Sequence, residues 1–141
     1  MNNLRRNKKG FTLIELVLVI ALLGVLAVSA LPNIFDISLT NARNNSRDAV
    51  VGAIQSALSL YAASQISQGN PESYPADLDG EADGTAAART APLFDTILQG
   101  GVTRGWTKVD DTCYTWTDGG AADDYDYDGA GGTFIYNAGG C

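Results

Sequence analysis

The sequence contains no histidine and two cysteines among its 141 residues. Without histidine the chain lacks the side chain that most often acts as a general base near neutral pH, and most types of zinc site are excluded. No nucleophile stands beside an evident base, and no pair of acids lies in an apolar setting that would raise a pKa. We therefore expect a non-enzymatic protein, and the length allows one modest domain.

Positive charge is scarce and unevenly placed. The chain has nine basic and sixteen acidic residues, which give a formal net charge of −7. Four of the basic residues lie at positions 5–9, whereas every acid lies at Glu15 or later. Removal of residues 1–10 would leave five basic and sixteen acidic residues, a formal charge of −11. So acidic a body argues against nucleic-acid binding and suits a solvent-facing surface.

The chain has one long apolar run, residues 11–31, in which Thr12, Glu15 and Ser29 are the polar interruptions. A run of about 20 residues is long enough to cross a bilayer as a helix. The basic residues precede the run, so the pattern predicts that the N-terminus stays in the cytoplasm and the rest is translocated.

Three interpretations of this run compete: a simple membrane anchor, a secretory signal peptide cut after Ala30, and a precursor cut before the run. The small residues Val28-Ser29-Ala30 favour the second, which would release a soluble binding domain. Glu15 favours the third, because a carboxylate in a membrane helix costs roughly 2.5–3.5 kcal/mol and an anchor or signal peptide has no use for it. Cleavage after Gly10 would create a partner for that carboxylate, the new α-amino group of Phe11.

The segment before and into the run reads Lys8-Lys9-Gly10-Phe11-Thr12-Leu13-Ile14-Glu15. It resembles the processing motif of type IV pilins and the related pseudopilins, as a prepilin with a class III-type leader. The resemblance covers about the first 35 residues. It implies that a prepilin peptidase cuts after Gly10 and that Phe11 becomes an N-methylated mature N-terminus. It also implies that Glu15, the fifth mature residue, serves in assembly, and Pro32 falls where many members carry a proline.

Two of these residues have roles that make physical sense. Glu15 can neutralise the Phe11 ammonium of a neighbouring subunit inside an apolar filament core, because either charge buried alone is costly while the pair is tolerable. Such pairing also sets the axial register between subunits. Pro32 removes one backbone donor and is expected to kink or locally open the helix.

Beyond Pro32 an amphipathic pattern continues the helix. Apolar residues recur at helical spacing at Val50, Ile54, Ala57, Leu58 and Tyr61, broadened by Val51 and Ala62. Gly69 and Pro71 are a stop signal, so we expect one helix from about residue 11 to about residue 68. The expected organisation is a leader at 1–10, a transmembrane and filament-core helix at 11–35, its amphipathic continuation at 36–68, and a globular head at 69–141.

The head is expected to complete an α+β fold. Residues 70–90 are rich in Pro, Asp, Gly and Ala and predict a loop. Thr90 could cap a short helix over residues 91–99 that Gly100-Gly101 ends. Short aromatic and β-branched segments at 105–109, 113–117 and 133–137 predict strands of a small antiparallel sheet packed against the long helix.

Cys113 and Cys141 both lie in the part that would be exported, where a disulfide is the default expectation. It would close a loop of 28 residues, worth about 3–4 kcal/mol on the chain-entropy model. Many type IV pilins resemble this arrangement, and pseudopilins of secretion systems less often have it.

An acidic cluster precedes the last predicted strand. Asp124, Asp126 and Asp128 alternate and Gly129 follows, as in the first half of an EF-hand loop, but Ile135 stands at the twelfth position, where a bidentate Glu is needed. Two interpretations stay open: a solvated acidic turn, or a different calcium site. Further carboxylates that could complete such a site are Asp110, Asp111 and Asp118.

These observations together predict a structural subunit of a type IV pilus. No cofactor is expected other than calcium, which the acidic cluster could bind. The partners of the subunit would be other pilin subunits, the prepilin peptidase and an inner-membrane assembly platform. It would reside in the inner membrane and then in a surface filament for adhesion, motility or DNA uptake. The look of the tail suggests the mannose-sensitive haemagglutinin type. A pseudopilin of a type II secretion system is the alternative, which Tyr74-Pro75 and the acidic cluster leave open, and a secreted binding domain is a remote one.

Overall fold

The computed structural model describes residues 10–117 and 120–141, with the side chains of residues 30–38 outside the described set. The chain divides into two compact units, Met1–Ala42 and Arg43–Cys141. The helix α1, Leu13–Ser67, begins in the first unit and ends in the second. The long helix predicted from about residue 11 to about residue 68 is therefore confirmed.

The C-terminal end of α1 is closed by the predicted glycine. Gly69 has a φ of 81°, a left-handed conformation that glycine adopts without penalty. The Asn70 amide donates to the carbonyl of Gln65 at 3.0 Å, and the Gly69 amide donates to the carbonyl of Ile66 at 3.0 Å. This pair of bonds is a Schellman motif, which satisfies carbonyls that the helix end would leave without donors.

In the second unit, α1 buries the stripe that the sequence predicts. Ile54 and Leu58 are fully buried, and Ala62 is 5% exposed. The remaining members of the stripe are half-buried: Val50, Val51, Ala57 and Tyr61. This face of the helix supplies one side of the core of the head.

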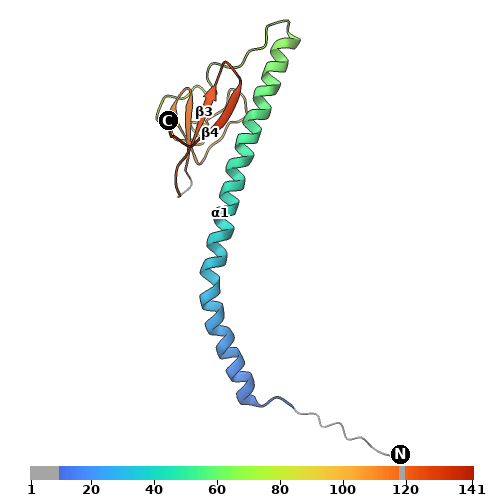
Figure 1. Cartoon of the computed structure of the whole chain (residues 1–141), viewed down its shortest axis with the longest axis vertical. Coiled ribbons are helices and arrows are strands. Elements are labelled where there is room, and N and C mark those ends of the chain that lie inside the picture. Colours follow the sequence, from blue (N-terminus) through green and yellow to red (C-terminus); the bar gives the residue numbers. More distant parts are fainter. Residues whose placement is uncertain (1–9, 118–119) are drawn as a thin grey trace, which may run out of the picture. The chain divides into compact units, whose positions relative to one another are not determined.

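Four antiparallel strands in the order β1-β2-β3-β4 form the sheet of the head (Figure 1). Their bounds are β1 Trp106–Asp110, β2 Cys113–Trp116, β3 Asp123–Asp128 and β4 Thr133–Asn137. The expected fold class, a long helix packed against a small antiparallel sheet, is confirmed. The sequence analysis missed β3, because aspartate is depleted in strands.

Aromatic side chains from the sheet fill the space between strands and helix. Tyr114 and Phe134 are fully buried, and Trp106 is 2% exposed. Phe94 reaches them from the loop before β1, with its ring centroid 4.6 Å from that of Tyr114 and 5.7 Å from that of Phe134. Together with Ile54 and Leu58 these residues form one contiguous hydrophobic cluster.

The helix predicted over residues 91–99 is wrong. Leu93 instead pairs with Val102 through two backbone hydrogen bonds of 2.9 and 2.7 Å. Phe94 has a φ of 64°, which an α-helix does not allow. The pairing of Leu93 with Val102 therefore overrides the local capping signal at Thr90. Thr90 instead forms, together with Arg89, the tip of a tight turn between the paired residues Ala88 and Ala91.

Candidate functional site

The predicted processing point lies immediately before α1. Phe11 is 91% exposed, and the helix begins two residues later at Leu13. Thr12 and Glu15 bind each other across the first turn. The Glu15 amide donates to Thr12 Oγ1 at 3.3 Å, while the amide and hydroxyl of Thr12 donate to Glu15 Oε2 at 2.8 and 2.9 Å.

This reciprocal arrangement is a capping box. It satisfies amides that have no partner within the helix, and it places a negative charge at the positive end of the helix dipole. Only a role between subunits was predicted for Glu15 from the sequence, and this local role is new. The signal was present as Thr12 followed three residues later by Glu15.

The first part of α1 exposes its apolar side chains on all faces. Exposed fractions run from 45% at Val17 to 81% at Leu13, and Val28 is still 74% exposed. An apolar surface of this extent marks contact with a membrane or with another protein. The predicted transmembrane and core-forming segment therefore has no cover within the described part of the chain.

A second stretch of α1, Leu39–Ser67, is also long and apolar enough to cross a membrane by length and composition, with a mean hydropathy of 1.3. Its buried side chains Ile54 and Leu58 contact the core of the head. The part of this stretch from Arg43 onward therefore belongs to the head, whereas the shorter apolar helix Leu13–Ser29 lies in the first unit. The backbone at Pro32 is helical, and its side chain lies outside the described residues.

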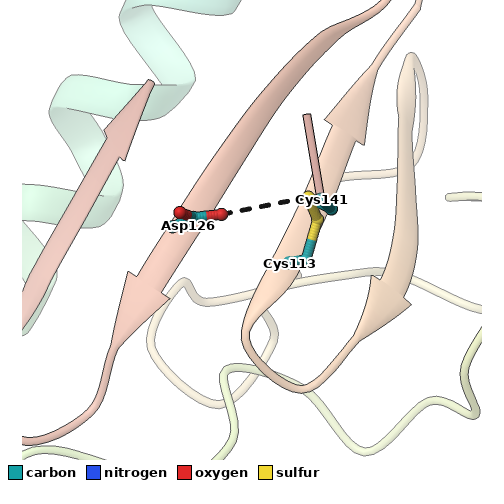
Figure 2. Close-up of side chains that lie close together, drawn as sticks. All are labelled: Cys113, Asp126 and Cys141. Carbon is teal, nitrogen blue, oxygen red and sulfur yellow. Dashed lines mark hydrogen bonds between the residues drawn. A yellow bond between two sulfur atoms is a disulfide. The ribbon is translucent and has the colours of Figure 1, made fainter. Parts of the chain in front are cut away.

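The predicted disulfide is confirmed: Cys113 on β2 bonds Cys141, with Cα atoms 6.1 Å apart (Figure 2). Cys113 is buried, whereas Cys141 is exposed. Asn137 helps to hold the segment between β4 and Cys141, because its Nδ2 donates to the Gly140 carbonyl at 3.1 Å and to Asp126 Oδ2 at 2.8 Å. The disulfide therefore fixes the C-terminal segment against the outer face of the sheet.

Among the residues that the structure describes, one group of potential metal ligands lies within mutual reach: Cys113, Asp126 and Cys141. Figure 2 shows the two sulfurs bonded to each other beside the Asp126 carboxylate, with the Cys141 sulfur 3.9 Å from Asp126 Oδ1. A cysteine sulfur binds a metal ion as the thiolate, and the two sulfurs here are joined in a disulfide. The group is therefore a disulfide with a neighbouring carboxylate and not a metal centre.

The acidic cluster lies on the strand β3, and not in the turn that was one of its two interpretations. Asp124, Asp126 and Asp128 alternate with buried Tyr125 and Tyr127 along β3. Alternate residues of a strand are about 6.6 Å apart, so the carboxylates do not converge as in a calcium loop. Each also accepts a hydrogen bond of its own, from the Thr115 hydroxyl, the Asn137 side-chain amide and the Ala130 backbone amide respectively. Asp118 lies outside the described residues, and calcium binding stays a prediction.

A buried ion cluster surrounds Lys108 and was not predicted from the sequence. The Lys108 side chain is fully buried, and its Nζ lies 3.0 Å from both Asp77 oxygens, 3.2 Å from Asp79 Oδ1 and 2.8 Å from Asp111 Oδ1. Burial alone would lower the pKa of Lys108, but the hydrogen bonds to Asp111, Asp77 and Asp79 raise it above its ordinary value. The cluster ties the loop before β1 to the sheet.

Comparison with known proteins finds similarity in the N-terminal segment. Residues 5–31 match the family described as the prokaryotic N-terminal methylation motif. A 48-residue stretch is 50% identical to the type IV wide pilus major component PilA4 of Thermus thermophilus, and it covers 34% of this chain and 33% of that protein. The match therefore spans about a third of the relative's length. No solved structure matches the chain.

Proposed function

We propose that the chain is the precursor of a structural subunit of a type IV pilus. The observation that carries the proposal is the coincidence of the methylation motif at residues 5–31 with an apolar helix exposed on all faces. Such a helix needs a bilayer before assembly and other helices afterwards. The similarity to a pilus component supports the same function.

Cleavage after Gly10 would place an ammonium on Phe11, one residue before the cap at Thr12. A cation at a helix N-terminus is unfavourable, because that end of the helix dipole is positive. Glu15 binds Thr12 through Oε2, and within the described residues its Oε1 makes no hydrogen bond. We infer that Oε1 receives the Phe11 ammonium of a neighbouring subunit, and that N-methylation of Phe11 leaves this charge in place.

The remaining parts of the proposal concern partners and location. A prepilin peptidase removes residues 1–10, and an inner-membrane platform extracts the mature chain from the membrane into a surface filament. Adhesion, motility or DNA uptake are tasks of that filament. Pro32 removes one backbone hydrogen-bond donor and thereby kinks or locally opens the helix within the filament core. The comparisons give no support for the mannose-sensitive haemagglutinin subclass.

The experiment that tests the proposal is intact-mass analysis and N-terminal sequencing of protein sheared from the cell surface. We expect a chain that starts at Phe11 and carries one added methyl group. Its mass should also be lower by the two hydrogens that the cysteines lose when they form the disulfide. A chain that starts at Leu31 would show that a signal peptidase had cut it, and the filament subunit would be ruled out. A processed chain that is confined to the periplasm would instead favour a secretion pseudopilin.

A further inference from the structure

A surface hollow of about 650 Å³ lies between α1 and the strands β3 and β4. Its helix side includes Arg47, Asp48 and Gln55, and its sheet side includes Asp123 and Tyr136. Gln55 Nε2 donates to the Phe134 carbonyl at 3.0 Å, which joins the helix to the edge strand. The walls of the hollow are therefore fixed by contacts across it.

The hollow is acidic and carries an exposed aromatic ring. Arg47 forms ion pairs with Asp48 and Asp123, and its guanidinium carbon lies 5.5 Å from the centroid of the Trp116 ring. Two carboxylates against one guanidinium leave a charge of −1. The Asp48 side chain is 63% exposed and Tyr136 is 57% exposed, so both are accessible from solvent. A hollow lined by both a carboxylate and an exposed tyrosine ring suits a second guanidinium.

Exposed arginines are found at the other side of the same sheet. The segment that ends in the Ala88–Ala91 turn lies along β1, since the Ala87 amide donates to the Trp106 carbonyl at 2.8 Å. Arg89 stands at the tip of that turn and Arg104 lies shortly before β1. Both are exposed, and neither makes a hydrogen bond or ion pair within the described parts of the chain.

We propose that the hollow is the docking site for the Arg89–Thr90 turn of a second copy of this chain. The Arg89 guanidinium would bind the Asp48 carboxylate and stack on the Tyr136 ring. The proposal rests on the proposed function, because it identifies a contact between heads of neighbouring filament subunits. The expected occupant is a second copy, because this one sequence supplies both the acidic hollow and the exposed arginine that complements its charge.

The geometry of this contact differs from that of a symmetric dimer. The turn lies beyond β1 and the hollow lies beside β4, at opposite edges of the sheet. A contact between two different surfaces of the same protein is heterologous and leaves each surface free for one further copy. Repetition of the contact does not close after two subunits, and it extends an open filament when the rotation between copies does not close a ring.

Cysteine cross-linking within intact filaments tests the proposal. Both native cysteines are bonded to each other, so Thr90→Cys and Ile135→Cys, placed together in the full chain, would supply one thiol at the turn and one in the wall of the hollow. We expect mild oxidation to give a ladder of dimers, trimers and higher oligomers on a non-reducing gel. Each single variant is the matched control and should give no ladder.

The outcomes separate this contact from the proposed function. Absence of wild-type filaments from the sheared surface fraction would refute the proposed function. Filaments that form from the double variant but give no ladder, or a ladder that stops at dimers, would overturn the docking contact alone.

A charge exchange gives a second test that needs no cysteine. We expect Arg89→Asp to lower filament yield about tenfold, the effect of losing one arginine anchor from an interface. Adding Asp48→Arg should restore most of that yield, because the two charges are exchanged. Arg104→Asp is the matched control and should keep near wild-type yield. An equal loss from Arg104→Asp, or no rescue by Asp48→Arg, would overturn the contact.

Discussion

Lys108 Nζ lies 3.2 Å from Asp79 Oδ1, and both side chains are completely buried. Asp79 also accepts the backbone amides of Glu81 at 3.2 Å and Phe94 at 3.3 Å. It therefore holds the loop in which Phe94 adopts a left-handed φ, and it turns the Phe94 ring into the core. One ion pair thus connects β1, the loop and the aromatic cluster.

Replacement of Lys108 by methionine should destabilise the head strongly. The change leaves Asp79 buried without its cation, and breaking a buried pair in this way costs about 3–5 kcal/mol. Denaturant unfolding of the detergent-solubilised full chain, followed by the fluorescence of the buried Trp106 and Trp116, would measure the loss. Val109→Ala, on the exposed side of the same strand, is the control and should change the free energy of unfolding much less. Equal effects of the two variants would contradict the role of the ion pair.

Tyr114→Phe should stabilise the head at neutral pH. The Tyr114 hydroxyl is buried close to the Asp79 carboxylate but makes no hydrogen bond of normal distance and angle among the described residues, and such an unsatisfied group costs about 1–3 kcal/mol. Removal of the oxygen leaves the ring contacts with Phe94 and Phe134 in place. Thermal unfolding at pH 7 would detect the gain as a higher midpoint. A lower midpoint would mean that the hydroxyl has a partner in solution.

The same variant should flatten the loss of stability in alkali. Burial, followed by the charges of Asp79 and Asp77, raises the pKa of Tyr114, and burial raises the pKa of Tyr127 to about 12. A group with a raised folded pKa contributes stability that is complete below its unfolded pKa, about 10 for tyrosine, and is lost as the pH rises further. Lys108, whose pKa is also raised, acts in the same direction. Wild-type stability should therefore fall above about pH 10, and less steeply in Tyr114→Phe.

The local patterns of the sequence predict the helix and the disulfide well. The apolar spacing from Val50 to Tyr61 and the stop at Gly69 define a helix face and its end without reference to the rest of the chain. Two cysteines in a segment that is predicted to be exported leave one possible intramolecular pairing. Such features depend on neighbouring residues or on counting, so they can be recognised before the fold is known.

Features that depend on distant contacts could not be predicted in this way. In β3 the aspartates alternate with Tyr125 and Tyr127, but aspartate is depleted in strands, so this alternation did not predict a strand. The strand forms because β3 pairs with β2 on one side and with β4 on the other. The partners of Lys108 come from a loop 29–31 residues earlier and from the turn after β1. The one local hint was that Lys108 lies two residues after Trp106 in β1, so both side chains point to the same, buried face of the sheet.

Cys113→Ser should loosen the C-terminal segment. The disulfide closes a loop of 28 residues, and its removal costs about 3–4 kcal/mol on the chain-entropy model. We expect a lower unfolding midpoint and a lower filament yield, with faster proteolysis after β4. The double variant Cys113→Ser with Cys141→Ser is the control for effects of a single free thiol. A thiol assay that found both cysteines free in native filaments would contradict the structure.

The two roles of Glu15 can be separated by comparing three variants. Glu15→Gln keeps a capping side chain but removes the charge, whereas Thr12→Ala removes the cap and keeps the charge. Glu15→Ala removes both. If the carboxylate pairs with the Phe11 ammonium of a neighbouring subunit, Glu15→Gln and Glu15→Ala should be processed after Gly10 but fail to assemble.

Thr12→Ala should be processed and should still assemble, with a yield reduced only by the loss of the cap, which is worth about 1 kcal/mol to the helix. Intact mass of the membrane fraction would report processing, and the sheared surface fraction would report assembly. Normal filament yield from Glu15→Gln would show that the capping box is the whole function of Glu15. In that case the register between subunits would have to come from the apolar side chains of α1 and from contacts between heads.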